Sequence, residues 1–239
     1  MIKCAGQDQR FWKPGDIFEI PCPHCGQLVE FFKDEAERKC LNCKTVVANP
    51  KLALGCAQWC QYAEQCLGPS FGKQVVNITR NKLIDEMKTI FGSDQKRIRH
   101  ALTVLDYAER IQATEGGNPL TVKAAAILHD IGIHEAEKKY GSAQGHYQEI
   151  EGPPIAEKIL KKHNLPADVT EHICKIIANH HSGKNIDTLE FRIIWDADWL
   201  TNIPDDFPNA DREKLQKMID TVFKTSKGRQ IAAETFIKN

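Results

Sequence analysis

The sequence predicts a mainly α-helical protein that begins with a small cysteine-rich β domain. From about residue 80 onward, apolar residues recur with the spacing of amphipathic helices. Eight of the nine cysteines lie within the first 66 residues, beside a run of strand-forming residues. The 239 residues, 41% of them hydrophobic, suffice for one small and one medium domain. We assign residues 1–75 to the cysteine-rich domain and residues 76–239 to the helical domain.

Two Cys-x-x-Cys pairs mark the first domain. Cys22 and Cys25 form one pair, and Cys40 and Cys43 form the other. The fourteen residues between the pairs include the strand-forming run 28–32. This spacing is typical of a zinc ribbon, in which four thiolates hold a structural zinc ion and leave no open position.

The other N-terminal cysteines form a less specific pattern. Cys56, Cys60 and Cys66 supply three thiols, and Cys4 is the fourth by elimination. A second four-cysteine zinc site is the first expectation, and an iron–sulfur cluster and free thiols stay open, because the spacing is diagnostic of none of them. Cys174 stands alone in a helical pattern and is expected to be a small core residue.

The helical domain is expected to start after a turn-rich segment, residues 68–72. A helical pattern begins at Asn81, and the next runs from residue 95 to about 111. His100 lies beside the apolar stripe of that second helix, near its start.

The third helical pattern closes on an adjacent histidine and aspartate. Asn118 and Pro119 supply an N-cap and a first-turn proline, and Gly132 follows the other end. His129 and Asp130 therefore place an imidazole and a carboxylate side by side at a helix end.

The remaining chain reads as further helices. A helix around residues 169–177 places His180 on its inward stripe, and the apolar run 191–195 leads into Asp196 and Asp198. Two carboxylates there are unexpected unless a cation meets them. A closing helix is expected from residue 212, with a break near residues 225–229. Turns are expected at residues 140–145, 152–154 and 203–211.

In this order and spacing the residues resemble the HD superfamily of metal-dependent phosphohydrolases, over roughly residues 80–239. The family pattern is one His, an adjacent His-Asp pair and a distal Asp in an Ala-Asp-x-Leu context. The resemblance implies an HD-type all-helical bundle, with Asp196 supporting the metal ligands. It also implies a first metal bound by His100, His129, Asp130 and Asp198.

The binuclear branch of this superfamily has additional histidines. They correspond here to His146 and to His180 or His181, and Asp130 would then bridge two metal ions. Imidazole and carboxylate ligands suit Mn²⁺, Fe²⁺, Co²⁺ or Zn²⁺. The resemblance thus implies that a hydroxide held between two such ions hydrolyses a phosphoester of a nucleotide or another small phosphorylated metabolite.

Several basic side chains are candidates for the proton donor or phosphate clamp beside Asp130. Arg97 lies one turn before His100, and Lys184 follows the histidine pair; His134 and Lys139 are further candidates. The branch that cleaves cyclic dinucleotides has a Lys where this chain has Ile133, and its Gly-Tyr-Pro signature is absent here. That substrate is therefore disfavoured.

Two other classes of function stay open. A minority of the superfamily uses the same ligands to hold two irons that activate dioxygen, so an HD-type di-iron oxygenase is the first alternative. A regulatory or nucleic-acid-binding protein with a vestigial HD site is the second. The chain has 32 basic and 32 acidic residues, and this balance gives no support to nucleic-acid or membrane binding driven by net charge.

The cellular setting is expected to be the cytoplasm. The chain opens without an apolar signal region, and paired Cys-x-x-Cys motifs then favour metal over disulfides. No apolar run approaches the length of a membrane span. Formation of a homo-oligomer stays open, as does the role of the cysteine-rich domain as scaffold, oligomerisation surface or substrate lid.

Overall fold

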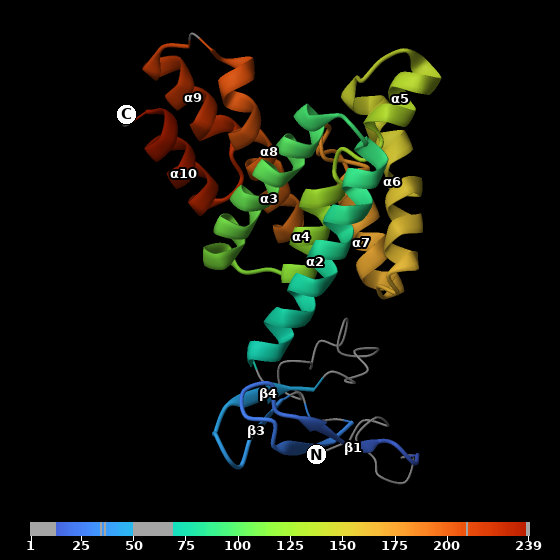
Figure 1. The fold of residues 1–239 in the computed structure, drawn as a ribbon. Coiled ribbons are helices and arrows are strands. Elements are labelled where there is room, and N and C mark those ends of the chain that lie inside the picture. Colours follow the sequence, from blue (N-terminus) through green and yellow to red (C-terminus); the bar gives the residue numbers. More distant parts are fainter. Residues whose placement is uncertain (1–12, 34, 36, 50–68, 209, 238–239) are drawn as a thin grey trace. The chain divides into compact units, whose positions relative to one another are not determined.

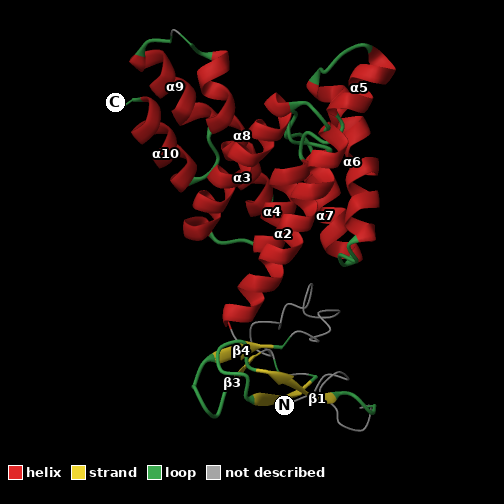
Figure 2. Ribbon diagram, viewed as in Figure 1, coloured by secondary structure: helices red, strands yellow, loops and turns green. Residues whose placement is uncertain are grey.

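The structure is a computed structural model that describes residues 13–33, 35, 37–49, 69–208 and 210–237. The chain divides into two compact units, Met1–Val75 and Val76–Asn239. All described strands lie in the first unit, and the second is helical (Figure 2). The predicted class, mainly α with a small cysteine-bearing β region, is confirmed.

Two antiparallel hairpins form the described part of the first unit. β1 (Ile17–Pro21) pairs with β2 (Leu28–Phe32), and β3 (Glu37–Lys39) pairs with β4 (Val46–Ala48). The predicted strand at 28–32 is thus confirmed. The alternation of strand side chains buries Val29 and Phe31 on one face of β2, against Val47 and two of the cysteines. A core this small provides little stability unless a further stabiliser is present.

The second unit is a helical bundle built around α4 (Pro119–Leu128) (Figure 1). Nearly every residue of α4 is buried, and α4 packs against α3, α7 and α8. The apolar sequence of this helix is what allows it to occupy the centre. The other helices are α2 (Pro69–Phe91), α3 (Gln95–Glu115), α5 (Ile133–Tyr140), α6 (Gly145–Lys162), α7 (Ala167–Ile177), α8 (Leu189–Asp206), α9 (Arg212–Val222) and α10 (Ser226–Phe236).

Side-chain caps fix where the two helices nearest the site begin. The Asn118 side chain accepts hydrogen bonds from the N–H groups of Leu120 and Thr121, at 3.0 Å each, so the predicted cap of α4 is confirmed. Asp94 caps α3 by accepting from the N–H of Arg97 at 3.1 Å. These caps set the helical register in which His100 and His129 stand.

Three of the expected turns are helical instead. Residues 69–72 belong to α2, where Pro69 takes the first position and no N–H donor is needed. Residues 152–154 lie inside α6, and residues 203–206 belong to α8. The expected break near residue 225 exists, but Thr225 caps a further helix, α10, by accepting from the N–H of Gly228. The prediction of helix ends from glycine and proline residues was therefore wrong at these three positions.

Among the described residues, no helix combines the length and the apolarity needed to cross a membrane.

Candidate metal centres

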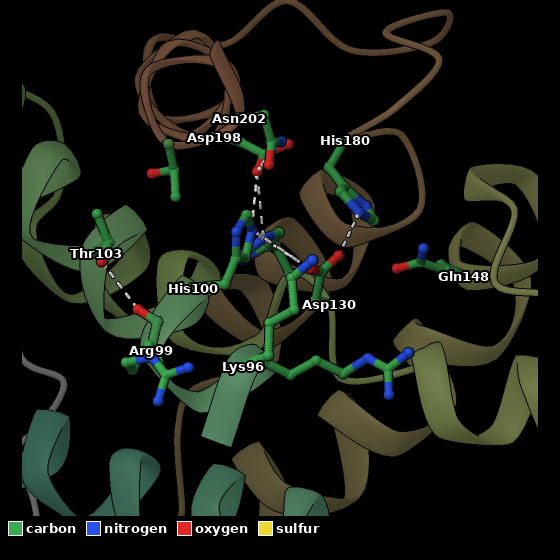
Figure 3. A network of polar contacts seen from close by, with 12 residues as sticks. Lys96, Arg99, His100, Thr103, Asp130, Gln148, His180, Asp198 and Asn202 are labelled. Atoms are coloured by element: carbon green, nitrogen blue, oxygen red, sulfur yellow. Dashed lines mark hydrogen bonds and ion pairs between the residues drawn. The ribbon is translucent and has the colours of Figure 1, made fainter. Parts of the chain in front are cut away.

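Histidines and aspartates that are distant in the sequence lie together in the helical unit (Figure 3). They come from the helices α3 and α8 and from the turns after α4 and α7. His100 lies in the second turn of α3, and Asp198 lies near the middle of α8. His129 caps the end of α4 and Asp130 follows it; His180 and His181 lie in the turn after α7. Of the seven residues predicted as metal ligands in this unit, the structure brings together all but His146.

Four side chains converge in a first group. His100 Nε2 lies 3.0 Å from Asp198 Oδ1, 3.2 Å from His129 Nε2 and 3.5 Å from Asp130 Oδ2. His129 Nε2 lies 3.4 Å from the same Asp130 oxygen. His100, His129 and Asp130 offer ligand atoms that all lie within 4.8 Å of one another. A single cation would fit among these atoms.

A second group shares Asp130. Its other oxygen, Oδ1, lies 3.4 Å from His180 Nε2, and ligand atoms of Asp130, His180 and His181 lie within 4.8 Å of one another. The two oxygens of one carboxylate thus face two different sets of imidazoles. This is the arrangement expected of a carboxylate shared by two cations.

Backbone carbonyls orient two of these imidazoles. Nδ1 of His129 lies 2.8 Å from the carbonyl of Ala126, and Nδ1 of His180 lies 2.7 Å from that of Ile177. A carbonyl only accepts, so each Nδ1 carries the proton and each Nε2 is left to face Asp130. In both rings Nε2 is therefore the atom available to bind a metal ion.

His180 gives a direct test of whether a metal fits. The residue is 3% exposed, and its Nε2 is buried with no hydrogen-bond partner in the described part of the chain. A buried nitrogen facing a carboxylate oxygen is costly unless a proton or a metal ion lies between them. The donor set around Asp130 therefore fits a divalent cation.

The electrostatics of the group also favour a positive ion. Burial alone would lower the pKa of His129, but Asp130 and Asp198 raise it to about 9. Burial raises the pKa of Asp130, yet His129 and His180 hold it well below its usual range. Desolvation of its ring, and then the neighbouring His180, lower the pKa of His181 to about 4, although the residue as a whole is exposed; a neutral imidazole is the form that binds a metal.

Two polar residues beside Asp198 have different roles. Asn202, one turn along α8, donates to Asp198 Oδ1 at 2.9 Å and orients it. Asp196 is fully buried but does not support the ligands as expected: it accepts from Lys224 N, Thr225 N and Thr225 Oγ1, each at 2.7 Å. Two residues apart on a helix point to nearly opposite sides, so Asp196 connects α8 to the start of α10.

His146 does not join the cluster. It lies in the first turn of α6, exposed, with its ring 3.8 Å from that of Tyr147. The neighbouring Gly145 does reach the site, because a Cβ there would lie 2.6 Å from the ring of His181. His146 is one residue further along the helix and so faces about 100° away.

Most of the basic candidates are engaged elsewhere. Arg97 pairs with Asp94 and Glu137, at 2.5 Å each. His134 lies 3.2 Å from Asp94, and Lys139 pairs with Glu151 at 2.5 Å. Lys184 is exposed and makes no ion pair with the cluster in the described residues.

The pKa of Asp94 reflects these contacts. The N–H of Arg97 lowers it to about 2, with help from His134 and the Arg97 guanidinium, although burial raises it. Arg97 and His134 are therefore held by an ionised carboxylate outside the cluster.

A small cavity opens beside the cluster. Its volume is about 310 Å³, and it is lined by His180, His181, Trp195, Asp198, Trp199, Asn202 and Asp206. Trp195 donates its indole N–H to the carbonyl of Val222 at 3.1 Å, which fixes that ring. These two tryptophans were not predicted as site residues from the sequence, although they lie four residues apart on one helix, beside Asp198.

The four cysteines of the two Cys-x-x-Cys pairs also meet. Sγ of Cys22 lies 3.6 Å from that of Cys43, and Cys25 lies 3.6 Å from Cys40. All four sulfurs lie within 4.8 Å of one another. A tetrahedron of sulfurs about 2.3 Å from a zinc ion has edges of about 3.8 Å. The thiols therefore fit a closed four-cysteine zinc site.

The remaining cysteines provide no further evidence of metal binding among the described residues. Cys4, Cys56, Cys60 and Cys66 lie outside the described residues, so the second cluster stays a prediction. Cys174 is half-buried and packs against the helical core, and burial raises the pKa of its thiol to about 11. It behaves as the small core residue that was expected.

Comparison with known proteins identifies the helical unit. The HD domain family model matches residues 97–203. A predicted HD superfamily hydrolase from an uncultured Thermotogales bacterium is 22% identical, with a TM-score of 0.49 over 64% of this chain and 83% of that one. An HD-superfamily hydrolase from Bacillus thuringiensis is 21% identical, with a TM-score of 0.48 over 66% of this chain and 89% of that one. No curated protein matches the sequence. The residues that match the HD domain family model include all six residues that meet at the cluster: His100, His129, Asp130, His180, His181 and Asp198.

Proposed function

We propose that this protein is a metal-dependent phosphohydrolase that acts on a phosphoester of a nucleotide or another small phosphorylated metabolite. The observation that supports this most directly is the shared carboxylate, since Asp130 Oδ2 faces His100 and His129 while Asp130 Oδ1 faces His180. Two divalent cations bound there would polarise a phosphoryl group and lower the pKa of an attacking water.

The residues would divide the binding between two ions. His100, His129, Asp130 and Asp198 would hold the first, and Asp130, His180 and His181 the second. The backbone hydrogen bonds at Nδ1 keep His129 and His180 in the ligating tautomer. Asn202 keeps one oxygen of Asp198 turned toward His100.

The cavity supports a substrate with a planar group. Indole rings from Trp195 and Trp199 line it beside His180, and aromatic side chains of this kind stack on nucleobases. Its volume of about 310 Å³ lies at the lower end for a small-molecule site.

Lys96 is a further cationic side chain on the helix that carries His100. It lies four residues before His100 on α3, so both side chains lie on one helix face, and it is largely exposed, 3.8 Å from Asp205. Lys96 therefore suits a substrate phosphate better than Arg97, whose charge is matched by two carboxylates. Neither Lys96 nor the tryptophans require a metal in order to bind a nucleotide.

The test is release of inorganic phosphate by metal-reconstituted protein. Protein stripped with a chelator would be reloaded with Mn²⁺, Fe²⁺, Co²⁺ or Zn²⁺ and supplied, under nitrogen, with a panel of nucleotides and simple phosphomonoesters. We expect turnover with Mn²⁺ in the absence of dioxygen, and a higher KM in Trp199→Ala. His172→Ala is a matched control, because this histidine lies on α7 and contacts Thr188 rather than the cluster.

Two results would contradict the proposal. A reaction that requires iron and dioxygen would identify the oxygenase alternative instead. Absence of phosphate release with every metal, together with unchanged nucleotide binding in Asp130→Ala, would favour a regulatory role for the site.

We also propose that the four-cysteine group binds one structural zinc ion. Cys40 is fully buried at the centre of this small core, and the sulfurs of all four cysteines lie within 4.8 Å of one another. Four thiolates complete the coordination of zinc, so no position is left for a substrate.

Replacing Cys40 with serine is expected to release this zinc and unfold the hairpins, because zinc binding supplies about 10–16 kcal/mol in comparable small domains. The measurement is zinc per chain, together with limited proteolysis within residues 13–49. The helical circular dichroism signal should persist. Cys174→Ser is the control and should retain zinc; retention of zinc and protease resistance by Cys40→Ser would refute the assignment.

A further inference from the structure

A glutamine on α6 has the same kind of unsatisfied atom as His180. Gln148 is 5% exposed, and its Oε1 is buried without a hydrogen-bond partner in the described part of the chain. Its Nε2 donates to the carbonyl of Ala143 at 2.7 Å. Because a carbonyl only accepts, this contact fixes which end of the amide is the nitrogen. The free acceptor is therefore an oxygen with a defined direction.

The position of Gln148 on α6 places that oxygen near the second group. Gly145, Gln148 and Gly152 are three and four residues apart, so they share one face of the helix. A Cβ at Gly145 would lie 2.6 Å from the ring of His181, and one at Gly152 would lie 3.9 Å from the carbonyl of His129. Gln148 lies between these two contacts, and Figure 3 shows its amide oxygen pointing toward Asp130 and His180.

The chemistry of the neighbours indicates what is missing. Asp130 Oδ1 is a carboxylate oxygen that only accepts, and Nε2 is the nitrogen of His180 that is available to bind a metal ion, because Nδ1 lies against the carbonyl of Ile177. Gln148 Oε1 is a further acceptor. A cation bound beside Asp130 and His180, or a water held by that cation, would supply the partner that the buried Gln148 oxygen lacks.

We propose that Gln148 is the carboxamide partner of the second metal ion, with its oxygen completing the group formed by Asp130, His180 and His181. This inference rests on the proposed two-metal centre. It gives the second site an oxygen donor where His146 was expected to supply an imidazole. Amide oxygens suit harder cations such as Mn²⁺, and imidazoles suit Zn²⁺ and Co²⁺ better. The second site should therefore favour Mn²⁺ more than a site with another histidine would.

The test is a Mn²⁺ titration of chelator-treated protein, with free Mn²⁺ followed by electron paramagnetic resonance. Wild type should bind two Mn²⁺ more than Asp130→Ala does. Gln148→Leu should bind the first ion normally and the second at least about tenfold more weakly. Gln148→Glu, which keeps an oxygen and adds charge, should retain the second ion. His146→Ala should bind both ions like wild type.

Thermal melting separates this role from a purely structural one. Without metal, Gln148→Leu should melt close to wild type, because removal of an unsatisfied buried acceptor offsets loss of the hydrogen bond to the carbonyl of Ala143. With saturating Mn²⁺ its gain in Tm should be smaller than that of wild type. Normal binding of both ions by Gln148→Leu, or loss of the second ion in His146→Ala, would overturn the inference while leaving the two-metal centre intact. A wild type that binds one Mn²⁺ would overturn the two-metal centre itself.

Discussion

Asp130→Ala is expected to lose both metal ions of the proposed centre and to release phosphate at least about a thousandfold more slowly than wild type. The reason is that each oxygen of Asp130 faces a different set of imidazoles, at 3.4–3.5 Å. Loss of metal assistance removes several kcal/mol of transition-state stabilisation, which corresponds to a rate factor of about 10³ or more. The measurement is elemental analysis after reconstitution, beside the phosphate-release assay.

The single-histidine variants make this prediction specific. His100→Ala should lose the ion of the first group and His180→Ala the ion of the second, because these side chains contact opposite oxygens of Asp130. Zinc at the four cysteines should stay constant and serve as an internal count. Asp106→Ala is a matched control, since this aspartate is exposed on α3. If Asp130→Ala retained as much metal as wild type, the shared carboxylate would not be a ligand.

Asp196→Ala is expected to destabilise the protein by roughly 3 kcal/mol. The substitution leaves the N–H groups of Lys224 and Thr225 without their acceptor, and a buried donor without a partner costs about 1–3 kcal/mol. It also removes the contact with the Thr225 hydroxyl, the N-cap of α10. The measurement is urea unfolding of metal-loaded protein at pH 8. Burial raises the pKa of Asp196 to about 6, although its hydrogen bonds lower it, so the carboxylate is ionised at that pH.

Asp196→Asn is the conservative comparison. It keeps one carbonyl oxygen to accept from the start of α10, so its loss of stability should be smaller than that of the alanine variant. Metal content should be unchanged in both variants, because Asp196 contacts none of the ligands. Equal stability of Asp196→Ala and wild type would show that other contacts hold α10 in place.

Local sequence signals predicted what depends on local chemistry. Asn118 was predicted as a cap because Asn is a preferred N-cap residue, whose side-chain oxygen accepts from the free N–H groups of the first turn. The strand at 28–32 was predicted from its residue types, and its alternating side chains meet the cysteine core. The resemblance to the HD superfamily implied a ligand set, and the structure brings together every member of that set except His146.

Prediction failed where a residue's role depends on a partner far along the chain. Asp196 and Asp198 are the same residue type in one apolar run, and only the packing of α10 shows that Asp196 serves its N-terminus. His146 and Gln148 differ by two positions on α6, and which of them faces the cluster depends on how α6 rotates against α7. Residues 152–154 were expected to form a turn because they read Gly-Pro-Pro. Gly152 instead allows α6 to pack closely against the side chain of Ile177, and the sequence does not show this packing.

That packing bears on how the site tolerates change over evolutionary time. A Cβ added to Gly132 would lie 2.4 Å from the backbone nitrogen of Gly152, and one added to Gly152 would lie 2.7 Å from the side chain of Ile177. Neither glycine has a side chain that could bind a metal ion. A substitution by alanine at either position would nevertheless push α6 away from the turn that carries Asp130. A survey of tolerated substitutions would therefore rank Gly132 and Gly152 with the metal ligands, and intolerance alone would not reveal which positions bind the ions.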